Sequence, residues 1–147
     1  MDNTIENDDK FTIGCYVEEN FSFSEDKVIE YCEFTGDKNP LHTDREYCKS
    51  TRFKKPIVPG MQLATLFPKL ISTTIPGPGT VYSEQSLSFI SYARIDQPLV
   101  ARIDVLEKND DEQYIILKTQ IKSINKTIVD GLGKVFLPSL FKKRKGR

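Results

Sequence analysis

The sequence is poor in the residues on which metal-binding and disulfide-rich proteins depend. It contains one histidine and three cysteines, Cys15, Cys32 and Cys48, which form no C-x-x-C pair. A zinc site needs several histidine or cysteine ligands at short spacing, and a disulfide framework needs paired cysteines. We therefore expect no metal site and three reduced thiols.

Long apolar runs and an excess of charge are also absent. No run approaches the roughly 20 apolar residues of a transmembrane helix, and the first ten residues, MDNTIENDDK, are acidic, whereas a signal peptide begins with basic residues. The 21 acidic side chains balance 21 basic ones, so composition gives no reason to expect nucleic acid as a partner. We expect a cytoplasmic protein without membrane insertion.

Length and the two chain ends predict a single domain. The chain has 147 residues, of which 38% are hydrophobic and 29% charged, as in an ordinary globular protein. The first residues carry almost no apolar side chain, and the last seven read FKKRKGR. We expect a disordered acidic N-terminal tail over residues 1–9, one domain over 10–140 and a basic C-terminal tail over 141–147.

Two helices are predicted between the tails. Ser24 is placed to cap a helix whose first turn is acidic, and Gly36 is placed to end it. A second helix, within residues 59–72, is apolar on nearly every side, which is typical of a buried helix. Pro68 lies inside this second pattern and should kink or shorten the helix, because proline lacks an N–H group.

The rest of the chain alternates between apolar and polar residues, which favours strands. Such segments cover residues 11–18, 80–93, 98–109, 112–125 and 127–138. The short turns between the last strands predict an antiparallel meander. An antiparallel sheet with one buried central helix belongs to the α+β class.

The segment TGDKNPLHTDREYC, residues 35–48, contains the single histidine, His42, five positions after Asp37. Residues five apart do not face each other on a straight helix. Pro40 favours a turn, which could bring the two side chains together around a water for acid–base chemistry. The simpler interpretation is a turn formed by Asp37 and Asn39, with His42 half-exposed and bonded to a carbonyl or to Asp44. Residue spacing leaves both interpretations open.

Three stretches resemble the MaoC-like (R)-specific enoyl-CoA hydratases: FTGDKNPLHTD, RFKKPIVPGMQLATLF and PGPGTVYSEQSLSFISYARIDQPLVARIDV. The resemblance covers about residues 23–138. It implies a hot-dog fold, in which a curved antiparallel sheet wraps around one long helix, and a homodimer. It also implies reversible hydration of trans-2-enoyl thioesters to (R)-3-hydroxyacyl thioesters. The acyl group would be carried on CoA or acyl carrier protein, as substrate and without a cofactor.

This resemblance assigns roles to four residues. Asp37 and His42 would hold and activate the water, and Asn39 would brace the site. The backbone N–H of Gly60 would bind the thioester oxygen as negative charge develops there. From the residues alone, Gly60 could equally belong to a loop before a helix. Pro59 stands where the family often has histidine.

Other interpretations follow from the same residues. Pro68 stands where family members often have a small polar residue near the substrate, so acyl chain length is not carried over. Lys54 and Lys55 could meet carrier phosphates or form a solvated loop. The alternatives to a hydratase are a 3-hydroxyacyl-carrier-protein dehydratase and a non-catalytic module that binds acyl thioesters. A thioesterase is a third possibility.

Overall fold

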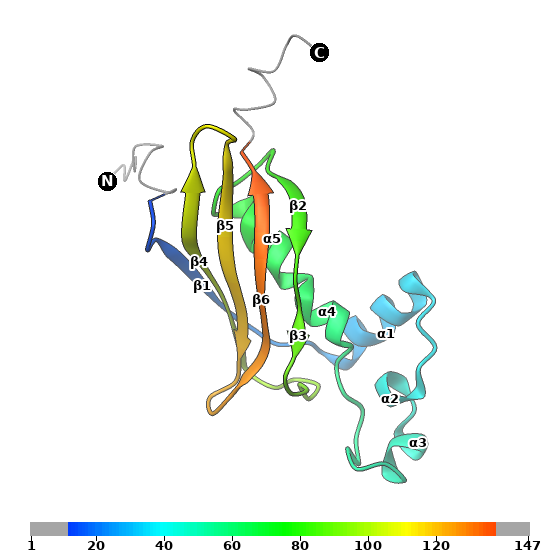
Figure 1. Cartoon of the computed structure of the whole chain (residues 1–147). Coiled ribbons are helices and arrows are strands. Elements are labelled where there is room, and N and C mark those ends of the chain that lie inside the picture. Colours follow the sequence, from blue (N-terminus) through cyan, green and yellow to red (C-terminus); the bar gives the residue numbers. More distant parts are fainter. Residues whose placement is uncertain (1–11, 138–147) are drawn as a thin grey trace, which may run out of the picture.

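The fold is one twisted antiparallel sheet with a central helix packed across one face (Figure 1). The computed structural model describes residues 12–137. The strand order is β1-β4-β5-β6-β2, and β3 also pairs with β6. The expected tails, 1–9 and 141–147, lie outside the described residues, as do both ends of the expected domain 10–140. The six strands are β1 (Tyr16–Phe21), β2 (Val81–Gln85), β3 (Ser88–Phe89), β4 (Leu99–Asn109), β5 (Tyr114–Lys122) and β6 (Thr127–Phe136).

Alternation of side chains gives the sheet one buried face. In β4 the buried positions are Leu99, Ala101, Ile103 and Val105, separated by partly exposed residues. Successive side chains of a strand point to opposite faces, so this pattern directs one apolar set toward the central helix. The predicted meander is present, because β4, β5 and β6 pair antiparallel in order.

The first helix, α1 (Glu25–Thr35), begins and ends as the sequence predicts. The side chain of Ser24 accepts a hydrogen bond from the N–H of Lys27, and Gly36 follows the helix with a left-handed φ of 75°. Glycine adopts this conformation without steric penalty, which explains the sharp end of the helix. Within α1, the side chains of Val28 and Cys32 are buried.

The central helix is divided in two, as Pro68 predicts. It consists of α4 (Gly60–Ala64) and α5 (Leu66–Thr73), joined at Thr65. Pro68 has no N–H to donate to the carbonyl of Ala64, so the regular hydrogen-bond pattern stops there. Phe67, together with other apolar residues of α5, is buried against the sheet.

Two short helices lie between Gly36 and Pro59, where the sequence pattern predicts neither a helix nor a strand. They are α2 (Pro40–Thr43) and α3 (Arg45–Lys49), capped by Asn39 and Asp44. In Figure 1, α1, α2 and α3 gather at one end of the molecule, and the β4–β5 hairpin lies at the other. Within residues 12–137, no helix is long and apolar enough to cross a membrane.

Two of the predicted strand segments differ most from the structure. The first strand begins at Tyr16, whereas the pattern places its start at residue 11. The predicted strand over 80–93 is divided into β2 and β3, with a register shift between Tyr82 and Glu84. Between these strands the chain stays hydrogen-bonded to β6, because the N–H of Ser86 donates to the carbonyl of Leu132.

Candidate active site

The turn between α1 and α2 is built by two side-chain hydrogen bonds. Asp37 Oδ1 accepts from the N–H of Asn39 at 3.0 Å, and Asn39 Oδ1 accepts from the N–H of Leu41 at 3.1 Å. Pro40 occupies the first position of α2, where its fixed φ suits a helix and its missing N–H is not needed. Asp37 and Asn39 are therefore turn formers, as the simpler interpretation requires.

This turn also brings the two candidate catalytic side chains together. His42 Nε2 lies 3.8 Å from Asp37 Oδ2. That distance is too long for a direct hydrogen bond, but one water oxygen can lie within hydrogen-bond distance of both atoms. The arrangement can hold a water between a carboxylate and an imidazole.

A backbone carbonyl from another segment orients the imidazole. His42 Nδ1 lies 2.9 Å from the carbonyl oxygen of Ile57. A carbonyl only accepts, so Nδ1 carries the proton, and in the neutral ring Nε2 is then an acceptor facing Asp37. His42 is 9% exposed, so the expectation of a half-exposed histidine is wrong. The simpler interpretation did expect a carbonyl partner, and the carbonyl of Ile57 is that partner.

The same carbonyl-bearing segment leads directly into the central helix. The N–H of Ile57 donates to the carbonyl of Leu41 at 3.0 Å, which closes a second bond between α2 and this segment. Gly60 follows three residues later and is the first residue of α4. The N–H at the first position of a helix has no intrahelical acceptor and is available to another partner.

Gly60 is packed closely against an aromatic ring. A Cβ atom at this position would lie 2.9 Å from Phe89 Cδ1 and 3.0 Å from Phe89 Cε1. Glycine therefore lets β3 approach the start of α4. Pro59, which precedes Gly60, is buried and has an extended ψ of 132°.

Ionisable neighbours of Asp37 are held in their protonated forms. Burial, and after it the negative charge of Asp37, raises the pKa of the Tyr31 hydroxyl. The same two causes raise the pKa of the Cys32 thiol. Neither group is therefore a base at neutral pH. Cys32 and Cys48 are buried and form no disulfide.

Two hydroxyl side chains in and after β2 have structural partners. The Tyr82 hydroxyl donates to Gln85 Oε1 at 2.8 Å, and the hydroxyl oxygen of Ser86 accepts from the N–H of Leu132 at 2.9 Å. Residues 12–137 contain no group of three or more histidine, cysteine, aspartate or glutamate side chains able to hold a metal ion. The role of Ile57 cannot be predicted from the sequence, because its backbone carbonyl orients His42 and every residue type carries such a carbonyl.

Comparison with known proteins identifies relatives of this chain. The model of the MaoC like domain family matches residues 5–127. The mitochondrial 3-hydroxyacyl-[acyl-carrier-protein] dehydratase FERN of Solanum lycopersicum is 33% identical over 87% of this chain and 78% of its own length. The (R)-specific enoyl-CoA hydratase of Aeromonas caviae is 35% identical over 67% of this chain and 74% of its own length.

Solved structures give the same result. The (R)-hydratase from A. caviae involved in PHA biosynthesis superimposes with a TM-score of 0.84 at 32% identity, covering 86% of this chain and 97% of that protein. The fold is thus the α+β hot-dog fold. The chain belongs to the MaoC-like domain family.

Proposed function

We propose that the protein is an (R)-specific hydratase that adds water reversibly to trans-2-enoyl thioesters, giving (R)-3-hydroxyacyl thioesters. The observation that carries this proposal is the Asp37–His42 pair, 3.8 Å apart, with the imidazole oriented by Ile57. The relatives named as enoyl-CoA hydratases and hydroxyacyl dehydratases support the same hydro-lyase chemistry.

The geometry suits conjugate addition of water. A water between Asp37 Oδ2 and His42 Nε2 faces two acceptors, so both of its protons are engaged and an oxygen lone pair remains for the β-carbon. Asp37 takes a proton as the new C–O bond forms, and negative charge moves to the thioester oxygen. The N–H of Gly60 stabilises that oxygen.

A second proton transfer completes the reaction. The proton held at the Asp37–His42 pair passes to the α-carbon, and the products contain one added water in total. Asn39 acts by positioning, because its side chain and its N–H make the two bonds that shape the turn. The reverse sequence is dehydration, the reaction named for the tomato and Arabidopsis thaliana relatives, whose names specify acyl carrier protein.

The test follows the ultraviolet absorbance of enoyl thioesters. Crotonyl-CoA, a medium-chain enoyl-CoA and the matching carrier-protein thioester are each mixed with the wild type and with Asp37→Asn. Loss of absorbance with the wild type only supports the proposal. No loss with any substrate contradicts it and favours a non-catalytic binding module. Release of free thiol would instead indicate a thioesterase.

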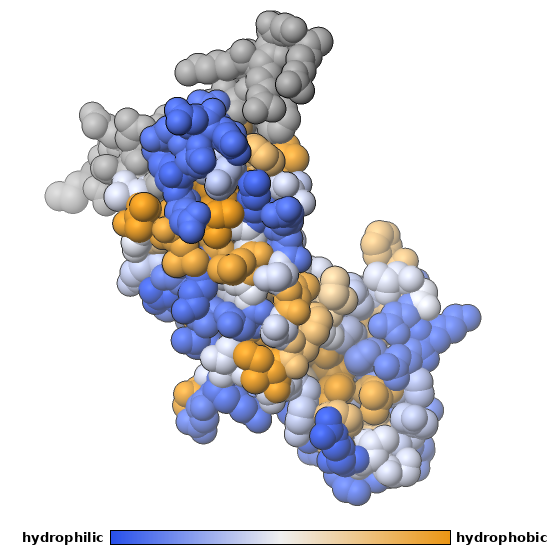
Figure 2. Space-filling view, in the orientation of Figure 1, coloured by the Kyte–Doolittle hydropathy of each residue, from blue (hydrophilic) through white to orange (hydrophobic). Residues whose placement is uncertain are grey.

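We further propose a cytoplasmic homodimer that forms through the sheet edge at β2 and β3. Several large apolar side chains are exposed along β2, β3 and nearby elements, and Figure 2 shows hydrophobic surface, in orange, among the polar residues. Open strand edges and exposed apolar groups favour association. These side chains are Met61, Val81, Phe89, Ile90 and Leu132.

The oligomeric state tests this assembly. Val81→Lys places a charge on the β2 edge and should shift the protein toward monomer in sedimentation velocity. Ile124→Lys is a matched control, because Ile124 is 91% exposed in the turn between β5 and β6. A monomeric wild type, or equal weakening by both substitutions, would contradict the proposed interface.

A further inference from the structure

A pocket of about 630 Å³ lies beside the segment that orients His42. Its wall includes Lys55 and Pro56, directly before Ile57, whose carbonyl accepts from the imidazole. Arg94 lies beside this segment and is paired with Ile57 in an isolated antiparallel bridge. The pocket and the candidate active site thus share one supporting segment.

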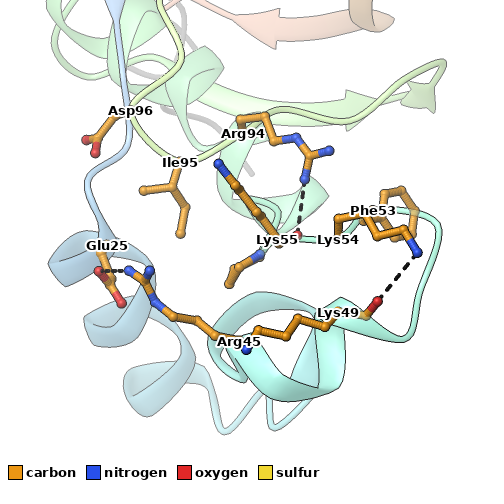
Figure 3. A pocket seen from close by; sticks show the side chains of 10 residues that line it. Glu25, Arg45, Lys49, Phe53, Lys54, Lys55, Arg94, Ile95 and Asp96 are labelled. Carbon is orange, nitrogen blue, oxygen red and sulfur yellow. Dashed lines mark hydrogen bonds and ion pairs between the residues drawn. The ribbon is translucent and has the colours of Figure 1, made fainter.

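Cationic side chains dominate this pocket. Figure 3 shows them pointing around a common opening, from α3, from the segment before Ile57 and from the chain at Arg94. The lining holds five cations and two carboxylates, Glu25 and Asp96, an excess of three positive charges. The whole chain is formally neutral, so this excess is local. The five cations are Arg45, Lys49, Lys54, Lys55 and Arg94.

Two of the cations are already neutralised, and three are not. Arg45 pairs with Glu25 at 2.7 Å, and Lys49 pairs with Glu46 at 2.6 Å. Lys54, Lys55 and Arg94 have no carboxylate partner among residues 12–137. Like charges repel at short range, so the pocket favours an anion with several acceptor oxygens.

The backbone holds these charges in place. Arg94 Nη1 donates to the carbonyl of Lys55 at 3.2 Å, and its guanidinium lies 5.0 Å from the ring centre of Tyr92. Lys54 has a left-handed φ of 66°, unusual for a residue with a side chain. Such conformations persist only where the surrounding structure stabilises them, and they cluster at active sites and ligand-binding sites.

We propose that this pocket binds the phosphate of the phosphopantetheine arm that carries the acyl group. This inference rests on the proposed thioester chemistry, and it deepens that proposal by placing the carrier end of the substrate. CoA and acyl carrier protein share the phosphopantetheine phosphate. From Lys55 to Gly60, five residues span at most about 17 Å of extended chain, which is within reach of a pantetheine arm.

A pair of substrates that differ by one phosphate tests the proposal. Crotonyl-pantetheine and crotonyl-4′-phosphopantetheine carry the same acyl group and the same thioester. With the wild type, we expect kcat/KM to be at least tenfold higher for the phosphorylated substrate, and this ratio should fall as ionic strength rises. Equal kcat/KM values would overturn the proposal.

Charge removal then locates the phosphate site. The double variant Lys54→Asn/Lys55→Gln removes two uncompensated positive charges. Asparagine is used at position 54 because it tolerates the left-handed backbone there. We expect kcat/KM to fall about tenfold for the phosphorylated substrate and less than twofold for the other. The control Lys108→Ala removes a lysine near the far end of the sheet and should alter neither value. An equal loss on both substrates would overturn the assignment.

Two further measurements separate the carrier and the chemistry. Crotonyl-CoA and a crotonyl carrier protein are assayed with the wild type and the double variant. Both carry the phosphopantetheine phosphate, so we expect kcat/KM to fall with both in the double variant, and the carrier with the higher wild-type kcat/KM is the preferred one. No fall with either would overturn the proposal. Calorimetry with 4′-phosphopantetheine and pantetheine reports binding without turnover. If no thioester is hydrated but the phosphorylated ligand binds tighter to wild type than to the double variant, the proposed function fails and the phosphate site stands.

Discussion

At the scale of single residues, the candidate site depends on the orientation of the His42 ring. Its Nδ1 is bonded to Ile57, and its Nε2 faces Asp37. The two side chains should contribute differently to the stability of the fold. Asp37 is 37% exposed at its side chain, whereas His42 is buried, and its loss would leave the carbonyl of Ile57 without this donor.

Substitutions at the two positions should therefore separate catalysis from stability. Asp37→Asn keeps the oxygen that accepts from Asn39, so we expect turnover to fall about 10²- to 10⁴-fold with little change in stability. His42→Ala should lose similar activity and also about 1–3 kcal/mol in the free energy of unfolding. Enoyl thioester assays and urea denaturation measure both. Near wild-type turnover in either variant would remove its catalytic assignment.

The role of Gly60 can be tested with a matched pair. Gly60→Pro removes the N–H, and proline is tolerated at the first position of a helix; the ψ of 132° at Pro59 also suits a residue before proline. Gly60→Ala adds a Cβ against Phe89 but keeps the N–H. We expect turnover of Gly60→Pro to be about 10²-fold or more below that of Gly60→Ala. Equal turnover, with circular dichroism spectra like wild type, would argue against the N–H as an oxyanion donor.

At the scale of elements, the close approach of the β2–β3 connection to β6 depends on two glycines. A Cβ at Gly131 would overlap the backbone carbonyl of Ser86, which cannot move without shifting the strand. At Gly133 a Cβ would meet the side-chain oxygen of Gln85 at 2.9 Å. Side chains adjust more easily than backbone, so the two positions differ in tolerance.

We expect the two alanine substitutions to differ accordingly. Gly131→Ala should lower the free energy of unfolding by about 3 kcal/mol or more, and Gly133→Ala by about 1 kcal/mol. Urea denaturation of both variants measures this difference. A Gly131→Ala variant as stable as the wild type would mean that the β2–β3 connection does not approach β6 this closely.

At the scale of the whole molecule, a half-buried polar network links β2 to β5. The hydroxyl of Tyr82 donates to Gln85, and Gln85 Nε2 donates to the hydroxyl oxygen of Thr119 at 2.9 Å. Thr119 is fully buried. Burial raises the pKa of Tyr82 to about 12, because the ionised phenolate loses solvation.

This raised pKa predicts a loss of stability at high pH. A tyrosine in the unfolded chain ionises near pH 10, so between about pH 10 and 12 the unfolded state loses a proton that the folded state retains. Stability should therefore fall across that window, by about 1–2 kcal/mol, because Tyr82 is only partly buried and solvent screens part of the effect. Tyr82→Phe should reduce this fall in urea denaturation at pH 9 and 11. An unchanged pH dependence in Tyr82→Phe would contradict the raised pKa.

Much of the fold follows from local physical chemistry. Ser24 and Gly36 determine the ends of α1 through hydrogen bonding and backbone freedom, and Pro68 divides the central helix because it lacks a donor. Side-chain alternation predicts β4, β5 and β6. The short helices α2 and α3 escape prediction, because elements of four and five residues are too short to show periodicity.

The sequence by itself determined the candidate site residues, their turn and the class of fold, because these depend on residue type and near neighbours. Only the tertiary structure decided the rest. The tautomer of His42 depends on Ile57, fifteen residues away, and the cationic pocket joins α1 and α3 to the chain near Arg94. The break between β2 and β3 accompanies the close approach of the Ser86 backbone to Gly131. Such contacts join segments that are distant in the chain, so they cannot be inferred from residue spacing.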